Sequence, residues 1–293
     1  MVKMCGNSPR VVVVGDFFPS KRNEKLFINN NNEFIDVALL KIIQDAKFSF
    51  CNLEGTLTRT CVKTEKLGPN IKASPDCIRA YKTVGFTHLA TANNHVNDFG
   101  QQGYLDTINS IKSQGLTFIG SGVNSTSINH YVVLSVDGKN ILFYNVAETM
   151  WNAPTNSLAG VFLYDEYVVC NELRELKTKS RIDYIVVLYH GGIEYFPYPS
   201  PELKKRFHRM ADSGADVILA QHSHCVGCEE WYNGSYLLYG QGNFLFDRQD
   251  LECCKSGLLL ELSFGNNINV KKTFTKVENG CVKKDEDQFH SGY

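Results

Sequence analysis

The stretch Val217-Ile-Leu-Ala-Gln-His-Ser-His224 sets the fold of this 293-residue chain. It is a short apolar run of strand character that ends in two histidines at positions i and i+2. On an extended chain, this spacing places both imidazole rings on one face, where they can point at one spot beyond the sheet. The stretch is typical either of a metal site at a strand end or of two polar loop residues, and the remaining chain decides between them.

Other predicted strands also end in polar side chains. Residues 10–16 read Arg-Val-Val-Val-Val-Gly-Asp, and such a run of valines is typical of a strand that is covered on both faces. Residues 48–54, 87–92 and 184–190 repeat the pattern. The polar residues at these strand ends are Asp16, Asn52, Glu54, Asn94, His95, His190, His222 and His224.

A second repeated unit is a helix, then a glycine, then a strand that starts within two residues. It occurs at Gly85, Gly115 and Gly214. This unit is typical of consecutive crossover connections in a mostly parallel sheet. Residues 21–33 are expected to be an exposed loop, and Asp137-Gly138 predicts a two-residue hairpin.

Length and composition indicate one large α/β domain over residues 1–275 and a polar C-terminal tail over residues 276–293. The chain is 43% hydrophobic and 12% aromatic, which is enough for a full core. A net charge of -1 provides no electrostatic footprint for nucleic acid. No apolar segment predicts a signal peptide or membrane insertion, so we expect a cytoplasmic protein whose ten cysteines are mostly reduced.

The polar strand ends predict a metal site. Open α/β sheets gather functional groups at the carboxyl ends of their strands, so one crevice can receive all of these side chains. Nitrogen ligands are prominent among them, which favours one or two divalent ions of Mn, Fe or Zn over Ca. A pair of such ions clamps an anionic oxygen ester and activates a water molecule.

The motifs also resemble a known family. In chain order they are Gly15-Asp16, Asn52-Leu-Glu54, Ala92-Asn-Asn-His95 with Asp98 and Gly100, Tyr189-His190-Gly-Gly-Ile-Glu-Tyr195, and His222-Ser-His224 followed by Leu238-Tyr-Gly-Gln-Gly-Asn-Phe-Leu-Phe-Asp247. Together they resemble the bacterial poly-γ-glutamate capsule biosynthesis (CapA) family, a branch of the calcineurin-like metallophosphoesterases. The resemblance implies a four-layer α/β/β/α sandwich of two mixed sheets flanked by helices.

Residue by residue, the resemblance implies two metal positions. Asp16 and His224 would bind one ion, Glu54 would bridge, and the second ion would take the remaining ligands, which are Asn94, His190 and His222. His95 would assist the leaving group as an acid, oriented by Asp98. Metallophosphoesterases usually carry a histidine where Phe18 stands, so a single ion or a weak second site is an open alternative.

Five residues are expected to contact substrate: Asn52, Lys66, Lys72, Glu194 and Tyr195. The two lysines would hold an anionic substrate, although surface lysines are often only solvated. Glu194 and Tyr195 would line the pocket mouth, with loop bracing as the alternative. Cys225 and Cys228 are interpreted as small residues that pack a loop.

The resemblance implies a metal-dependent hydrolase of an anionic ester or γ-glutamyl amide in capsule synthesis or processing. Its partners would be an anionic polymer or a phosphate-containing small molecule, together with capsule-synthesis proteins. A non-catalytic factor for polymer binding and assembly is a second hypothesis. A generic metallophosphoesterase unrelated to capsule is a third.

Overall fold

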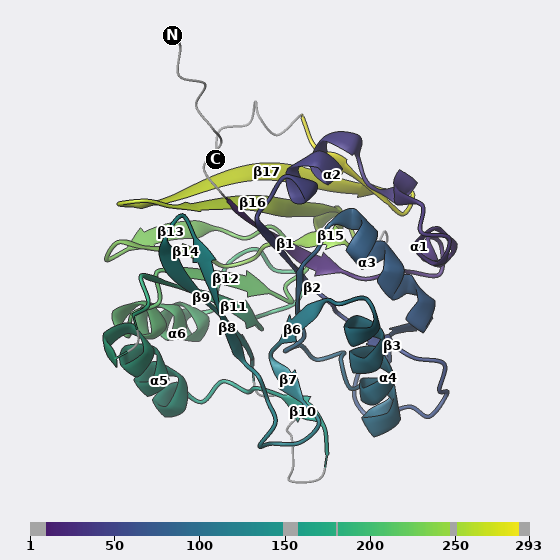
Figure 1. Cartoon of the computed structure of the whole chain (residues 1–293), viewed down its shortest axis with the longest axis horizontal. Helices are drawn as coiled ribbons and strands as arrows, with labels where there is room; N and C mark the ends of the chain where they lie inside the picture. Colours follow the sequence, from purple (N-terminus) through teal and green to yellow (C-terminus); the bar gives the residue numbers. More distant parts are fainter. Residues whose placement is uncertain (1–9, 149–157, 180, 247–250, 287–293) are drawn as a thin grey trace.

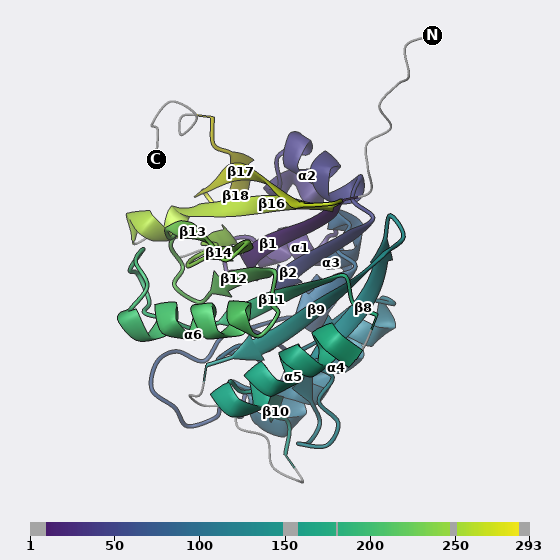
Figure 2. The same ribbon diagram turned by 90° about the vertical axis from the view of Figure 1, so that its left-hand side faces the viewer.

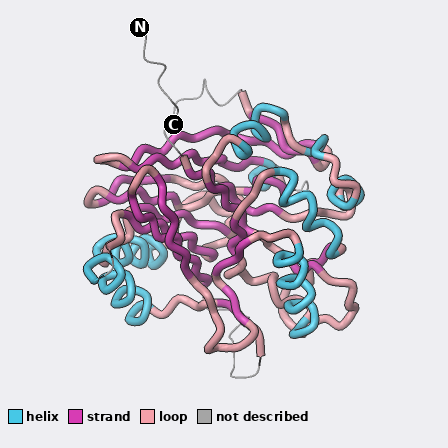
Figure 3. Tube along the Cα trace, viewed as in Figure 1, coloured by secondary structure: helices cyan, strands magenta, loops and turns pink. Residues whose placement is uncertain are grey.

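Two β-sheets pack face to face, and helices cover both outer faces (Figure 1). The computed structural model describes residues 10–148, 158–179, 181–246 and 251–286. Figure 3 shows the strands gathered in the centre, with helices on either side. The predicted four-layer α/β/β/α sandwich is therefore confirmed.

The first sheet has eight strands in the order β18-β17-β16-β1-β2-β5-β6, and β15 pairs with β1. Strands β1, β2, β5 and β6 run parallel, whereas β16, β17 and β18 are antiparallel. The strands are β1 (Val11–Phe17), β2 (Phe48–Asn52), β5 (His88–Ala90), β6 (Thr117–Ile119), β15 (Asn243–Leu245), β16 (Ser256–Phe264), β17 (Ile268–Glu278) and β18 (Cys281–Lys284). Its outer face is covered by α1 (Glu24–Ile28), α2 (Val37–Gln44), α3 (Ile78–Val84) and α4 (Gly100–Ser113).

The second sheet has six strands in the order β13-β14-β12-β11-β9-β8. They are β8 (Tyr131–Val136), β9 (Lys139–Ala147), β11 (Tyr184–His190), β12 (Val217–Gln221), β13 (Glu229–Tyr232) and β14 (Ser235–Leu238). Helices α5 (Glu166–Lys179) and α6 (Pro201–Asp212) cover its outer face (Figure 2). The shorter elements are β3 (Thr56–Leu57), β4 (Lys72–Ala73), β7 (Ser121–Gly122), β10 (Gly160–Val161), and the 3-10 helices η1 (Asn32–Phe34), η2 (Pro75–Cys77) and η3 (Glu252–Lys255).

The valine run of β1 shows why this strand is central. Val11 and Val13 pack between the two sheets, while Val12 and Val14 face the helices. All four side chains are fully buried. Because successive side chains of a strand point to opposite faces, a strand that is buried on both faces needs an uninterrupted apolar run.

Cap and turn residues mark where several of the elements begin and end. Ser200 Oγ accepts a hydrogen bond from the backbone N–H of Leu203, and Pro201 occupies the first turn of α6. Gly85 has a φ of 107° after α3, a backbone conformation that glycine adopts without strain. The predicted hairpin at Asp137-Gly138 joins β8 to β9, and the parallel crossover units are confirmed.

The expected exposed loop over residues 21–33 is wrong in part. It contains α1 and most of η1, and Phe27 is fully buried. The Phe27 ring stacks on the Phe34 ring with 4.3 Å between centroids. The run of four asparagines dominates the composition of this segment, but the two phenylalanines anchor it to the core.

The expected polar tail from residue 276 is also wrong as far as residue 284. Strand β17 continues to Glu278, and β18 pairs with it. Val277 and Val282 are buried on one face of this hairpin, whose turn Asn279-Gly280 has positive φ at both residues. The Asn-Gly turn signal is present in the sequence, but the charged composition of the surrounding segment led to the prediction of a polar tail. Residues 287–293 lie outside the described residues.

Candidate metal centre

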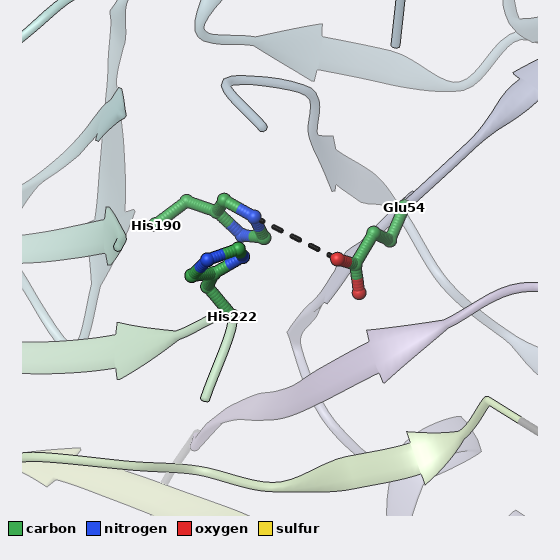
Figure 4. A group of neighbouring side chains, drawn as sticks. All are labelled: Glu54, His190 and His222. Atoms are coloured by element: carbon green, nitrogen blue, oxygen red, sulfur yellow. Dashed lines mark ion pairs between the residues drawn. The ribbon is translucent and has the colours of Figure 1, made fainter. Parts of the chain in front are cut away.

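Two groups of side chains meet where strands of both sheets end. Asp16, Glu54 and His224 form the first group, and Glu54, His190 and His222 form the second. Within each group the candidate ligand atoms lie within 4.8 Å of one another. Figure 4 shows the second group, in which His190 Nε2 is 3.7 Å from Glu54 Oε1. Glu54 thus belongs to both groups.

Buried acceptor atoms in this cluster show that a cation fits. Asp16 Oδ2, both carboxylate oxygens of Glu54, and His222 Nδ1 have no hydrogen-bond partner among the described residues. Leaving one such atom unpaired in a protein interior costs about 1–3 kcal/mol. Carboxylate oxygens and imidazole nitrogens are also the donors that Mn, Fe and Zn take in proteins. The donor set therefore suits one or two divalent ions.

The His222-Ser-His224 turn has a strained backbone. His222 has a φ of 95° and His224 a φ of 56°, in a region that side chains other than glycine rarely adopt. Such strain costs on the order of 1–3 kcal/mol per residue and is often found at functional sites. The turn brings the His222 ring to 4.8 Å from the His190 ring, measured between centroids.

Asn94 lies beside the second group. Its Oδ1 lies 2.9 Å from His190 Nε2. The backbone amide of His95 is held by Asn93 Oδ1, which steadies this turn.

Asn52, expected to contact substrate, lies beneath the site instead. It is fully buried, and its Nδ2 donates to Asp16 Oδ1 at 2.7 Å. The same atom is 3.2 Å from His190 Nδ1, and Asn52 Oδ1 accepts from Asn93 Nδ2. Asn52 therefore orients Asp16 and His190 from behind.

His95 and Asp98 form the expected pair. His95 Nδ1 is 2.7 Å from Asp98 Oδ2, and both side chains are buried. Burial lowers the pKa of His95, the Asp98 contact opposes this shift, and Lys66 adds to it. Because the Asp98 carboxylate only accepts hydrogen bonds, Nδ1 carries the proton in the neutral ring and Nε2 is free to exchange one.

Lys66, also expected to contact substrate, supports this pair instead. Its ammonium donates to Asp98 Oδ1 and to the backbone oxygen of Asn94, and the side chain is only 4% exposed. Lys72 is exposed, donates to the Thr60 carbonyl and lies over the Phe99 ring. These contacts are on the β4 side of the chain, and neither of them involves a candidate metal ligand.

Glu194 and Tyr195 lie next to the candidate metal ligands His222 and His224. Glu194 Oε1 is 3.8 Å from His222 Nε2, and the side chain is 41% exposed. The Tyr195 ring stacks on His224 with 5.9 Å between centroids. Both residues therefore lie beside candidate metal ligands. Glu194 is exposed to solvent and Tyr195 is partly buried.

The two buried carboxylates have opposite pKa shifts. Burial raises the pKa of Glu54 well above its ordinary value, and the charge of Asp16 adds to this. Burial would also raise the pKa of Asp16, but contacts with His224, His190 and Asn52 outweigh it and hold the pKa well below its usual range. Asp16 is thus the carboxylate that stays charged, and Glu54 is the one whose charge needs a cation.

Two of the histidines are held neutral. Burial lowers the pKa of His222 to about 4, and burial together with the nearby His222 lowers that of His190 well below its ordinary value. A neutral imidazole is the form that binds a metal ion.

The structure adds Asn243 to the site, although the sequence reasoning gave it no role. Its Oδ1 lies 2.9 Å from His224 Nδ1. It belongs to the quoted segment Leu238-Tyr-Gly-Gln-Gly-Asn-Phe, but an asparagine within a strand carries no signal for site chemistry. Only the pairing of β15 with β1 brings it beside Asp16.

A cavity of about 30 Å³ adjoins the second group, next to His190 and His222. Gly191 and Glu148 also line it. A Cβ atom at Gly191 would lie 2.6 Å from the Glu148 Cβ, so only glycine leaves room for Glu148 here. Glu148 in turn accepts from the Gly192 amide and pairs with Arg206 of α6. This volume is enough for one water molecule.

A protein-family comparison agrees with this site. The model of the bacterial capsule synthesis protein PGA_cap matches residues 10–248. The chain belongs to the PGA_cap family. The matched span contains every candidate metal ligand named above.

Two curated PGA_cap relatives are similar over most of this chain. The capsule biosynthesis protein CapA of Bacillus anthracis is 27% identical over 245 residues, which are 81% of this chain and 60% of that protein. The PGA biosynthesis protein CapA of Bacillus subtilis is 28% identical over 240 residues, 80% of this chain and 62% of that protein. The chain thus spans about three fifths of the length of these relatives.

Solved structures share the fold of this PGA_cap member. A putative 5'-nucleotidase from Staphylococcus aureus superposes with a TM-score of 0.57 at 17% identity, covering 98% of this chain and 56% of that chain. The four-layer sandwich is thus the fold that this chain shares with that structure. Among the described residues, no helix is long and apolar enough to cross a membrane.

Phe18 occupies the position where a first-motif histidine was expected. The side chain is 1% exposed. Its ring packs against Gly55, where an added Cβ atom would lie only 2.4 Å from Phe18 Cζ. The ring fills the core behind the Glu54 turn, so this PGA_cap member provides three candidate ligands among His, Cys, Asp and Glu for the first group.

Proposed function

We propose that this chain is a metal-dependent hydrolase of an anionic ester or γ-glutamyl amide, acting in the synthesis or processing of a polyanionic capsule polymer. The observation that carries the proposal is Glu54, a fully buried carboxylate without a hydrogen-bond donor that is shared by two histidine-containing groups. The names of the relatives, capsule biosynthesis protein and PGA biosynthesis protein, support the capsule setting. A cytoplasmic location and capsule-synthesis partner proteins stay predictions.

Each residue has a role in this proposal. Asp16, Glu54 and His224 would hold a first divalent ion, and Asn94, His190 and His222 together with Glu54 would hold a second. When bound, the ions supply Lewis-acid polarisation of the substrate and lower the pKa of a water molecule. Asn52 keeps Asp16 and His190 in register from below.

We assign the proton transfer to His95. Asp98 holds its Nδ1–H, so Nε2 is the atom that gives a proton to the leaving group or takes one up. Lys66 neutralises Asp98 from its other oxygen and fixes the carbonyl of Asn94. Glu194 and Tyr195 would contact the substrate at the mouth.

Metal content tests the first half of the proposal. Purified protein is expected to hold Mn, Fe or Zn near stoichiometry, measured by elemental mass spectrometry. His222→Ala should lose metal. His208→Ala should keep it, because His208 is a partly exposed histidine of α6 that pairs with Glu230 of β13. A metal-free wild type whose stability ignores chelators would exclude the metal centre.

Turnover tests the second half. We expect hydrolysis of bis(p-nitrophenyl) phosphate or of a γ-glutamyl p-nitroanilide by the metal-loaded protein. His95→Ala should lower kcat by about 10²- to 10⁴-fold and leave the metal bound. Turnover of phosphate esters alone, with no capsule polymer or γ-glutamyl substrate accepted, would support a generic metallophosphoesterase instead.

One observation favours a second candidate, a non-catalytic factor that binds the polymer during assembly. Phe18 leaves the first group short of the histidine that phosphoesterases usually carry. Binding of poly-γ-glutamate without turnover under Mn, Fe or Zn would support this role.

A further inference from the structure

The short strand β15 lies beside the metal centre because two glycines allow it to approach β1. Asp16 of β1 and Asn243 of β15 are register partners in a parallel pair. A Cβ atom at Gly15 would lie 2.1 Å from the backbone oxygen of Gly242, so no larger residue fits there without moving the strands apart. This close approach places the Asn243 side chain next to the first group of candidate ligands.

Both ends of the Asn243 amide are engaged. Its Nδ2 donates to the backbone oxygen of Cys254 at 2.8 Å. A carbonyl oxygen only accepts, so the amide orientation follows, and Oδ1 is the atom that faces His224 Nδ1 at 2.9 Å. Asn243 therefore presents a fixed acceptor to the His224 ring.

The surroundings of His224 then determine which ring nitrogen carries the proton. Nδ1 faces two acceptors, Asn243 Oδ1 at 2.9 Å and Asp16 Oδ2 at 3.1 Å. Because both of these oxygens only accept hydrogen bonds, Nδ1 must carry a hydrogen here, and the shorter of the two distances is the one to Asn243. The other nitrogen, Nε2, faces Glu54 Oε1 at 3.8 Å.

Two aromatic rings fix the plane of the His224 ring, but they do not determine which way round the ring sits after a half-turn about the Cβ–Cγ bond. The Phe246 ring stacks on the His224 ring, with 4.9 Å between centroids and an interplanar angle of 16°. The Tyr195 ring also stacks on His224, at 5.9 Å and 22°. Stacking contacts are almost unchanged when an imidazole turns over by half a turn. A directional hydrogen bond is needed to select one orientation.

We propose that Asn243 is a positioning residue of the metal centre, which holds His224 so that Nε2, together with Asp16 and Glu54, faces the first cation. The inference rests on the proposed metal centre. It assigns a role to the Gly240–Asn243 part of the quoted segment that the hydrolase proposal leaves unused. The effect is confined to the first group, because His190 and His222 do not depend on this hydrogen bond.

The test is calorimetric titration of Mn²⁺ into the full chain after dialysis against a chelator. Partners that orient a metal-binding histidine typically contribute 10- to 100-fold in metal affinity. We expect Asn243→Ala to weaken one of two binding events by that factor, the same event that His224→Ala weakens. Asn243→Asp keeps an acceptor toward His224 but gives up the donor to the Cys254 carbonyl, so it should lose less affinity than Asn243→Ala.

The matched control is Asn23→Ala. Asn23 is also buried and bonds to backbone at both ends, to Ser20 N and Gly280 O, but it lies outside the metal groups. It should leave both binding events unchanged. Equal Mn²⁺ affinities in wild type and Asn243→Ala, or equal losses in Asn243→Ala and Asn243→Asp, would overturn the role of Asn243 alone. A wild type that binds no Mn²⁺ would overturn the metal centre as well.

A second measurement needs no variant. Long-range ¹H–¹⁵N NMR spectra of the metal-free wild type report which nitrogen of each histidine carries the proton. We expect the Nδ1–H form for His224. Observation of the Nε2–H form would contradict the proposed positioning, whatever the activity of the protein.

Discussion

At the scale of single residues, Glu54 is fully buried and neither of its oxygens accepts a hydrogen bond from the described residues. Glu261, by contrast, is 3% exposed and is paired with Arg10 and Lys271, each at 2.7 Å. Two buried carboxylates of one protein thus differ in whether the chain supplies their counter-charge. Because of this difference, we expect replacement of the two carboxylates to change the free energy of unfolding in opposite directions.

Glu54→Gln is expected to abolish metal binding and to stabilise the metal-free protein. Glutamine needs neither a counter-charge nor the uptake of a proton that the raised pKa of buried Glu54 implies at neutral pH, so the free energy of unfolding in a chelator should rise by about 1–3 kcal/mol. Glu261→Gln should lower it, because the change leaves Arg10 without its partner. Denaturant unfolding and elemental analysis measure both effects. A destabilised, metal-free Glu54→Gln protein would contradict the assigned role.

His88, which is not among the candidate metal ligands, makes the free energy of unfolding depend on pH. Its ring stacks on Phe50 at 4.7 Å, and burial lowers its pKa from 6.5 to about 4. Since the folded pKa is the lower one, the unfolded chain binds more protons as the pH falls below about 6.5, and stability is lost on acidification. Between pH 7 and pH 5 this proton uptake lowers the free energy of unfolding by about 2 kcal/mol.

The variant His88→Gln should therefore lose less stability than wild type over the same pH range. Urea unfolding at pH 7 and pH 5 in the presence of a chelator measures the difference. An identical loss in both proteins would show that His88 is not buried as a neutral ring.

At the scale of elements, the pairing of β1 with β15 links the backbone to the metal site. Gly15→Ala would force its Cβ against the Gly242 carbonyl and push β15 away from Asp16. We expect weaker Mn²⁺ binding at the first group, in the same direction as Asn243→Ala. Gly265→Ala is the control, because the nearest atom to its Cβ would be at an ordinary 3.8 Å. Unchanged Mn²⁺ affinity in Gly15→Ala would separate the strand pairing from the site.

At the scale of the whole molecule, the candidate ligands come from both sheets. Asp16 lies near the end of β1 and Glu54 follows β2, both in the first sheet. In the second sheet His190 ends β11, and His222 and His224 follow β12. A bound cation would therefore join the two halves of the sandwich. Metal binding is expected to stabilise the global fold and not only a loop.

Mn²⁺ at about 100 times its Kd should raise the free energy of unfolding by about 2.7 kcal/mol for each site. Thermal unfolding with Mn²⁺ and with a chelator measures this shift. Glu54→Gln should show no such dependence. A wild-type Tm that is the same under both conditions would contradict a metal that bridges the sheets.

Local patterns in the sequence predict most of the elements. The valine run, the helix–glycine–strand units and the Asp137-Gly138 turn each correspond to observed structure, because backbone preference and burial act over a few residues. The motif resemblance adds the sandwich of two sheets. Where composition masked local signals, as for α1 and the β17–β18 hairpin, the prediction failed.

By itself, the sequence determined the elements, the family and the residues that gather at the strand ends. Only the tertiary structure decided what each of those residues does. Asn52 and Lys66 are directed at Asp16 and Asp98 rather than at a substrate, and Asn243 joins the site from a strand far along the chain. The physical reason is that a polar side chain at a strand end has several partners within reach, and the packing of the two sheets selects among them.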